Sequence, residues 1–153
     1  MLDLTRVLAG PFCSMMLGDM GAEVIKVEEP GKGDDTRSWP PFAGGEATYF
    51  IAVNRGKKSL TLNLKAPEGQ EILRKLVRRS DVLIENFRPG TMGKLGFGYA
   101  ALARLKTELA TVRAGGTSEI LDVLIVYKWQ DLFGPFTQPP AEISHRETET
   151  RSP

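Results

Sequence analysis

The feature that most constrains the fold is a regular alternation of strand-like and helix-like segments from the start of the chain to residue 109. Alternating or β-branched apolar residues predict the strands, and apolar residues at helical spacing predict the helices. Strands are expected at residues 1–7, 22–28, 59–64 and 81–86, and helices at 9–21, 47–54, 66–80 and 99–109. This order predicts an α/β domain with a largely parallel sheet.

The segment APEGQEILRKLVRRS at 66–80 gives the clearest helix signal. Pro67 suits a first helical turn, and the acidic residues precede the basic ones, as the helix dipole favours. Ile72, Leu73, Leu76 and Val77 recur at helical spacing and form one predicted apolar stripe. The helix at 9–21 also has start and stop signals, since Gly10 and Pro11 suit its first turn and Gly21 suits its C-terminal end.

Composition excludes several classes of protein. The 153 residues carry a net charge of +1, which gives no electrostatic case for binding nucleic acid. A single cysteine, Cys13, excludes an intrachain disulfide and a multi-cysteine metal site, so no metal is expected. No apolar run approaches the roughly 20 residues that span a bilayer, and no targeting segment is visible. We therefore expect a soluble, intracellular chain without a membrane partner.

Two basic, glycine-flanked stretches resemble phosphate loops: GKGDDTR at 31–37 and VNRGKKS at 53–59. Neither has the spacing G-x-x-x-x-G-K-[ST] of a P-loop, and no G-x-G-x-x-G follows the first strand. The first of them lies in a Pro-, Gly- and Asp-rich loop at 29–46, and loops of this length are usually functional or mobile. The standard nucleotide motifs are therefore absent.

Three strand ends nevertheless carry features suited to an anion. In a parallel α/β sheet, ligands gather at the carboxyl ends of the strands, and a helix N-terminus favours negative charge. The segment TRVLAGP at 5–11 leads into such a helix, and Arg37 and Arg88 follow two other strands. Arginine suits phosphate or carboxylate, while Lys57, Lys58 and Lys65 flank the remaining strand. The alternative, that these are solvated surface charges, is favoured by composition alone.

Several single residues have two interpretations. Cys13 at a helix start could have a lowered thiol pKa, but beside apolar neighbours it is more often a small buried hydrophobe. Trp39 could stack on a ligand or fix its loop, and Asp34 and Asp35 could be acid–base groups or turn formers. His145, the only histidine, lies in a polar, proline-rich tail, which argues against a catalytic triad.

The motifs AGP at 9–11, GDDTR at 33–37, NRGKKS at 54–59, DVLIENFRPG at 81–90 and LGFGY at 95–99 occur in one order. In combination they resemble the N-terminal part of the class III CoA-transferases, the formyl-CoA transferase/CaiB–BaiF family. The resemblance runs from Leu2 to about Leu109. Within the family it is most similar to the succinyl-CoA:glutarate branch, and alpha-methylacyl-CoA racemase is a more distant relative.

The resemblance implies an incomplete Rossmann-like parallel sheet with flanking helices, which forms part of a large domain that binds coenzyme A (CoA). It implies no tightly bound cofactor, and the expected anions are the CoA phosphates. Lys94 stands where relatives often have arginine, and Asp34 and Thr36 match a loop near the site. The CoA-binding positions implied by the motifs are Val7, Leu8, Ala9, Arg37, Leu62, Asn63, Leu64, Lys65, Asn86, Phe87, Arg88 and Lys94.

The family's reaction moves CoA from an acyl-CoA to a small carboxylic acid, which are therefore the expected partners. An aspartate attacks the thioester and forms an anhydride and then an enzyme–CoA thioester, which is nucleophilic catalysis by a carboxylate. That aspartate follows a GYGQTGP…GYD stretch, which has no counterpart in this sequence. Asp122 and Asp131 do not lie in the matching setting, so the catalytic residue is unknown.

The resemblance divides the chain into three parts: residues 1–110 from the large domain, a non-matching segment of uncertain structure at 111–133, and a polar tail at 134–153 that is expected to be disordered. Family members are much longer and form interlocked homodimers, which this chain alone is not expected to form. Bacterial relatives can be cytoplasmic and eukaryotic ones mitochondrial, so the resemblance implies one of these two compartments. It is expected to be an inactive fragment of the enzyme. The alternatives are a non-catalytic CoA-binding fragment or isoform, and an unstable fragment whose open sheet edges aggregate.

Overall fold

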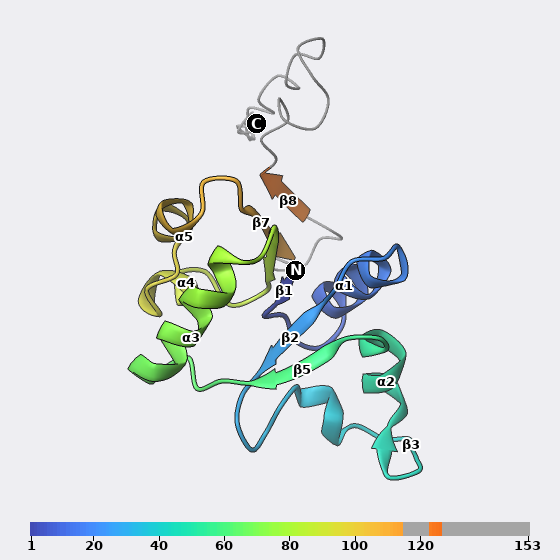
Figure 1. Ribbon diagram of the computed structural model, residues 1–153. Helices are drawn as coiled ribbons and strands as arrows, with labels where there is room; N and C mark the ends of the chain where they lie inside the picture. Colours follow the sequence, from blue (N-terminus) through green and yellow to red (C-terminus); the bar gives the residue numbers. More distant parts are fainter. Residues whose placement is uncertain (115–122, 127–153) are drawn as a thin grey trace, which may run out of the picture.

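The computed structural model describes residues 1–114 and 123–126 (Figure 1). Its main sheet has six strands in the order β5-β2-β1-β6-β7-β8, and a short hairpin, β3-β4, forms a second sheet. The strands are β1 (Leu2–Asp3), β2 (Ile25–Glu28), β3 (Phe42–Ala43), β4 (Glu46–Ala47), β5 (Lys58–Thr61), β6 (Val82–Glu85), β7 (Ala110–Ala114) and β8 (Val123–Val126). Asp122, Asp131, His145 and the predicted tail lie outside the described residues.

Five strands of the main sheet, from β5 to β7, run parallel, and β8 pairs antiparallel with β7. The two-residue strand β1 is central, because Leu2 pairs with Ile25 of β2 on one side and Leu83 of β6 on the other. The carboxyl ends of β1, β2, β5 and β6 therefore meet at one edge of the sheet. The predicted parallel α/β fold is confirmed.

Helices cover both faces of the sheet, with α1 and α2 on one face and α3, α4 and α5 on the other (Figure 1). The helices are α1 (Ala9–Asp19), α2 (Thr48–Asn54), α3 (Pro67–Arg78), α4 (Thr91–Lys94) and α5 (Tyr99–Leu105), and a 3₁₀ helix, η1, covers Asp35–Ser38. No helix within the described ranges is long and apolar enough to cross a membrane.

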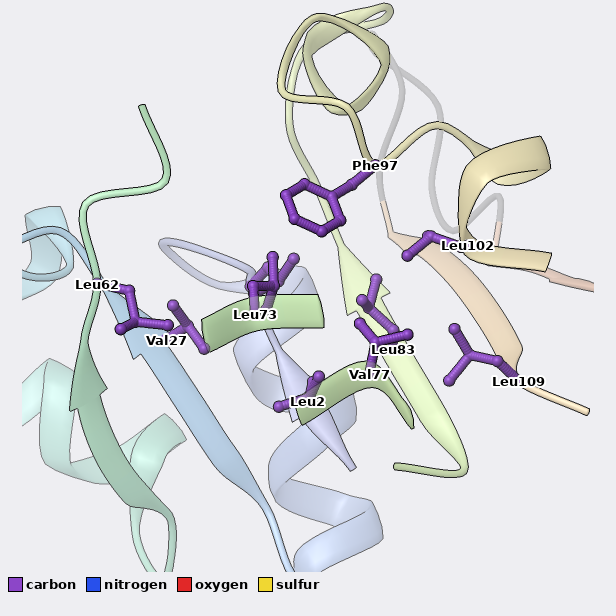
Figure 2. Close-up of a cluster of buried hydrophobic side chains, with 10 residues drawn as sticks. Leu2, Val27, Leu62, Leu73, Val77, Leu83, Phe97, Leu102 and Leu109 are labelled. Carbon is purple, nitrogen blue, oxygen red and sulfur yellow. The ribbon is translucent and has the colours of Figure 1, made fainter. Parts of the chain in front are cut away.

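The larger core lies between the sheet and α3 (Figure 2). Leu73 and Val77 of α3 are fully buried against Leu2 and Leu83 of the sheet. A smaller cluster on the opposite face contains Ile84 of β6, and Cys13 of α1 packs against it. Neighbouring residues of β6 thus supply the two faces alternately, as the pleat of a strand requires.

The ends of the predicted helices agree with their residue types. Pro67 begins α3, and Gly21, with a φ of +102°, follows α1. The amide of Gly21 donates to the carbonyl of Gly18, and that of Ala22 to the carbonyl of Leu17. These two bonds form the Schellman motif that a glycine at this position favours.

Several features differ from the expectations. Ile72, predicted in the apolar stripe, is 43% exposed, because only the Leu73–Val77 side of α3 faces the sheet. The segment 91–94, for which no helix is predicted, forms α4, and the loop at 29–46 contains η1 and the β3-β4 hairpin. Strand β7 has no counterpart in the prediction, and β8 lies in the segment 111–133, whose structure the sequence does not define.

Candidate functional site

A cavity of about 280 Å³ opens at the carboxyl ends of β1, β2, β5 and β6. It brings together five of the predicted CoA-binding residues: Leu62, Asn63, Leu64, Lys65 and Phe87. Its other lining residues are Leu4, Arg6, Val27, Glu28, Glu29, Thr91 and Leu95. Its walls are therefore apolar, with charged groups among its lining residues, which is the composition typical of a ligand site.

The segment 62–65 is held at the cavity by the end of β5 and the start of α3. The amide of Leu62 donates to the carbonyl of Glu28 at 2.9 Å, which extends the pairing of β5 with β2. The side chain of Asn63 accepts from the amide of Lys65 at 3.0 Å and so closes a tight turn. A Cβ atom at position 69 would lie 2.1 Å from the carbonyl oxygen of Asn63, so α3 needs glycine there.

The turn after β1 carries Arg6 into the same cavity. The amide side chain of Asn86 accepts from the Arg6 backbone N–H at 2.9 Å and donates to the Arg6 carbonyl at 2.8 Å. Val7 follows with a φ of +71°, which is rare for a β-branched residue, and its N–H lies 3.3 Å from both carboxylate oxygens of Asp34. Asn86 and Asp34 therefore fix this turn from two sides.

Below this turn lies a network of buried charges. Lys57 pairs with Asp3 at 2.9 Å and Lys26 with Asp34 at 2.9 Å, and the Nζ of Lys26 also donates to the carbonyl of Thr5 at 2.8 Å. Burial alone would raise the pKa of Asp3, but the charges of Lys26 and Lys57 and hydrogen bonds from hydroxyl groups outweigh it and lower that pKa. The Asp3 carboxylate is therefore held in its charged form, and the two ion pairs join the ends of β1 and β2.

Arg37, predicted to bind the anion, is already paired inside the protein. Its Nε and NH2 atoms each lie 2.7 Å from an oxygen of the buried Glu28 carboxylate, and its guanidinium lies 3.8 Å from the ring centre of Phe50. Burial would raise the pKa of Glu28, but hydrogen bonds from Arg37, Ser59 and the amide of Asp34 lower it to about 2. In this arrangement Arg37 supports the loop and lines neither this cavity nor the next.

Arg88 lines a second cavity of about 610 Å³, between the β6–β7 face of the sheet and the α4–α5 layer. It lies there with Glu85 and Arg113, whose charged groups are 3.6 Å apart. Lys94 is exposed at the end of α4 and lines neither cavity, and Leu8 and Ala9 are exposed at the start of α1. The predicted CoA-binding residues are thus divided between a compact group of five and several outlying positions.

The remaining candidate residues favour the structural interpretations. Burial raises the pKa of the Cys13 thiol, and the Asp3 carboxylate raises it further, so the lowered pKa considered for Cys13 is wrong. Asp34 caps η1 and pairs with Lys26, and Asp35 pairs with the exposed Lys32. Trp39 packs on Tyr49 with the ring centres 5.5 Å apart, which fixes the loop. Across residues 1–114, no group of three acidic, His or Cys side chains forms a metal site.

Of the seven lining residues that were not selected from the sequence, two form an ion pair with each other: Arg6 and Glu29. Arg6 belongs to the TRVLAGP segment that drew attention to this strand end, but only its neighbours were chosen. Glu29 follows β2 directly. For both residues, the sequence signal that could have indicated a ligand site was their position at the end of a predicted parallel strand.

Comparison with known proteins identifies the family of this fold and cavity. CoA-transferase family III matches residues 1–116, a range that includes the whole of β7. The chain belongs to CoA-transferase family III. The family predicted from the sequence motifs is therefore confirmed.

Relatives of this family III chain are considerably longer than it is. Human succinyl-CoA:glutarate CoA-transferase is 60% identical over 99 residues, which cover 64% of this chain and 23% of that protein. Acetyl-CoA:oxalate CoA-transferase from Acetobacter aceti is 50% identical over 115 residues, which cover 75% of this chain and 30% of that protein. This chain therefore spans less than a third of the length of these relatives.

Solved structures agree with this assignment. A CAIB/BAIF family protein from Brucella suis superposes with a TM-score of 0.69 and 44% identity, covering 73% of this chain and 31% of that one. Rv3272 from Mycobacterium tuberculosis gives a TM-score of 0.69 and 43% identity, covering 73% of this chain and 32% of that one. The α/β fold of this family III chain is thus part of a larger fold in its relatives.

Proposed function

We propose that this chain binds CoA or an acyl-CoA in the 280 Å³ cavity at the carboxyl ends of its parallel strands. The observation that carries the proposal is the convergence of two separate motifs on this cavity. The segment 62–65 follows β5 and Phe87 follows β6, and the cavity is lined by both. Both segments resemble family III enzymes in sequence, although they are far apart along the chain.

The chemistry of the cavity suits such a ligand. Apolar walls from Leu62, Leu64 and Phe87 fit an adenine ring or a pantetheine arm, and the cations Arg6 and Lys65 fit phosphate groups. In a complete family member, the bound acyl-CoA would pass its CoA to a small carboxylic acid. The glutarate and oxalate in the names of relatives support a carboxylic acid as the acceptor class.

We assign CoA binding, and not catalysis, to this chain. No segment of the sequence resembles the stretch that carries the family's nucleophilic aspartate. A carboxylate nucleophile needs that stretch to reach the thioester. We therefore expect no glutaryl-CoA when the purified chain is incubated with succinyl-CoA and glutarate, whereas measurable turnover would refute the assignment. An interlocked homodimer is likewise not expected of this chain.

Calorimetric titration of the full chain with CoA tests the binding proposal. Lys65→Ala should weaken binding by about tenfold, since it removes a charged contact at the cavity. Arg88→Ala tests whether the ligand also reaches the neighbouring cavity. Lys58→Ala is the matched control, because Lys58 begins β5 at the opposite edge of the sheet and should not affect binding. A folded chain that does not bind CoA would contradict the proposal.

One observation favours the alternative of an unstable fragment. Phe12, Met16 and Met20 lie four residues apart along α1, and all three are exposed, Met20 by 75%. An unpaired apolar stripe of this kind promotes aggregation. Light scattering during size-exclusion chromatography separates the two cases, since a CoA-binding module elutes as a defined species and an unstable fragment as heterogeneous aggregate.

A further inference from the structure

Arg6 is held at its backbone but only weakly at its head group. Asn86 binds both its N–H and its carbonyl, at 2.9 and 2.8 Å. The guanidinium, in contrast, has a single ionic contact, to Glu29 at 3.3 Å, and lies 5.9 Å from the ring centre of Phe87. The side chains of Arg6 and Glu29 are 35% and 43% exposed. The Arg6 head group can therefore change partner without movement of the main chain.

Arg37 shows what a permanently paired arginine looks like in the same region. Its two bonds to Glu28 are 2.7 Å long, and the carboxylate that accepts them is buried. Glu28 is thereby neutralised by Arg37. Three other charged residues line the cavity: the cations Arg6 and Lys65 and the anion Glu29. An exposed single-contact pair contributes little free energy, whereas a phosphate offers arginine two acceptors and more charge.

We infer that Arg6 is a phosphate-binding residue of this cavity and that Glu29 weakens the binding of phosphorylated ligands by competing for its guanidinium. This inference rests on the proposed function, since it names the group that holds the CoA phosphates. The ligand phosphate replaces the Glu29 carboxylate on Arg6, while Asn86 keeps the Arg6 backbone in place. Glu29 thus acts as a specificity-determining residue, because an anion with too little charge cannot displace the Glu29 carboxylate from the Arg6 guanidinium.

The test is calorimetric titration of the full chain and its variants with CoA. Arg6→Ala should weaken binding by about tenfold, as expected for loss of a charged hydrogen bond. Glu29→Gln should tighten binding by about three- to fivefold, the amount that an exposed ion pair contributes. A merely structural role of Glu29 cannot produce tighter binding. In the Arg6→Ala background, Glu29→Gln should change affinity by less than about twofold, because the competition no longer exists.

Asp19→Asn is the matched control for the loss of one negative charge. Asp19 forms an exposed pair with Arg55 at the far end of α1, away from the cavity. Asp19→Asn should leave CoA affinity unchanged. If it tightened CoA binding as much as Glu29→Gln does, the effect would come from the net charge of the chain, and the inference would be overturned. Thermal melting shows whether each variant is folded.

The remaining outcomes separate the two proposals. If the unmodified chain binds CoA but Arg6→Ala or Glu29→Gln leaves the affinity unchanged, this inference fails and the proposed function stands. If neither the unmodified chain nor Glu29→Gln binds CoA while both are folded, the proposed function and this inference fail together.

Discussion

The Nζ atom of Lys57 lies 2.9 Å from Oδ2 of Asp3, and the two side chains are 2% and 0% exposed. Lys57 also donates to the carbonyl of Pro11 and to the side chain of Asn54, at 2.9 and 2.8 Å. All three donors of its ammonium group are therefore used inside the protein. This one side chain connects β1, the start of α1 and the end of α2.

Lys57→Met should destabilise the chain far more than Lys58→Met. Removing Lys57 leaves the Asp3 carboxylate buried without its ion-pair partner, a change that typically costs about 3–5 kcal/mol. Lys58 is 70% exposed and its pair with Glu23 lies in solvent, so losing that pair should change stability far less. Urea denaturation of both variants measures the difference. Equal midpoints would show that the Lys57–Asp3 pair contributes nothing beyond a surface contact.

These two neighbouring lysines also show why the site could be predicted only in part. Nothing in the sequence NRGKKS distinguishes Lys57 from Lys58, and charged residues are exposed by default. Burial of Lys57 depends on Asp3, which is distant in sequence and becomes a neighbour only when β1 and β5 both pair with β2. Glu29, whose carboxylate pairs with Arg6, could not be identified from the sequence for the same reason, because the two residues become neighbours only in the folded chain.

The parts that could be predicted have local signals. Pro67 and the apolar residues at 73 and 77 define α3, and the β-branched residues at 25 and 27 define β2. Helix α4 has only four residues, too few for a periodic pattern. The stretch at 62–65 is predicted to bind CoA only through its resemblance to the family, since nothing in its own composition indicates a ligand.

Acid should destabilise the chain between about pH 4.5 and pH 2, because Glu28 has a pKa lowered from 4.5 to about 2 in the folded protein. A carboxyl group with a lowered folded-state pKa stabilises the fold above its unfolded pKa, and this stabilisation is lost as pH falls through the folded value. Glu28→Gln should therefore be less stable at neutral pH and show a smaller fall in this window. Denaturation midpoints across the pH range measure both slopes. Parallel curves for the two proteins would exclude Glu28 as the cause.

Val7→Gly should leave the chain as stable as before or stabilise it by about 1 kcal/mol. Val7 has a φ of +71°, a left-handed conformation that costs a residue with a Cβ roughly 1–2 kcal/mol and costs glycine nothing. Val24→Gly is the control, because Val24 is buried and the cavity left by its side chain should destabilise the chain by about 2 kcal/mol or more. Thermal melting of both variants provides the comparison. A large loss of stability in Val7→Gly would mean that its side chain matters more than its backbone strain.

Gly69→Ala should damage both the fold and the proposed CoA site, whereas Gly93→Ala should do neither. A Cβ atom at position 69 would lie 2.1 Å from the carbonyl oxygen of Asn63, so either α3 or the segment 62–65 must shift. We expect a loss of about 2 kcal/mol in stability and weaker CoA binding, since overpacked sites cost about 1–3 kcal/mol. A Cβ at Gly93 in α4 meets nothing within 4 Å, and alanine there should stabilise the helix by up to about 1 kcal/mol. Denaturation and calorimetric titration with CoA measure the two effects, and unchanged affinity in a folded Gly69→Ala variant would argue that the segment 62–65 does not contact the ligand.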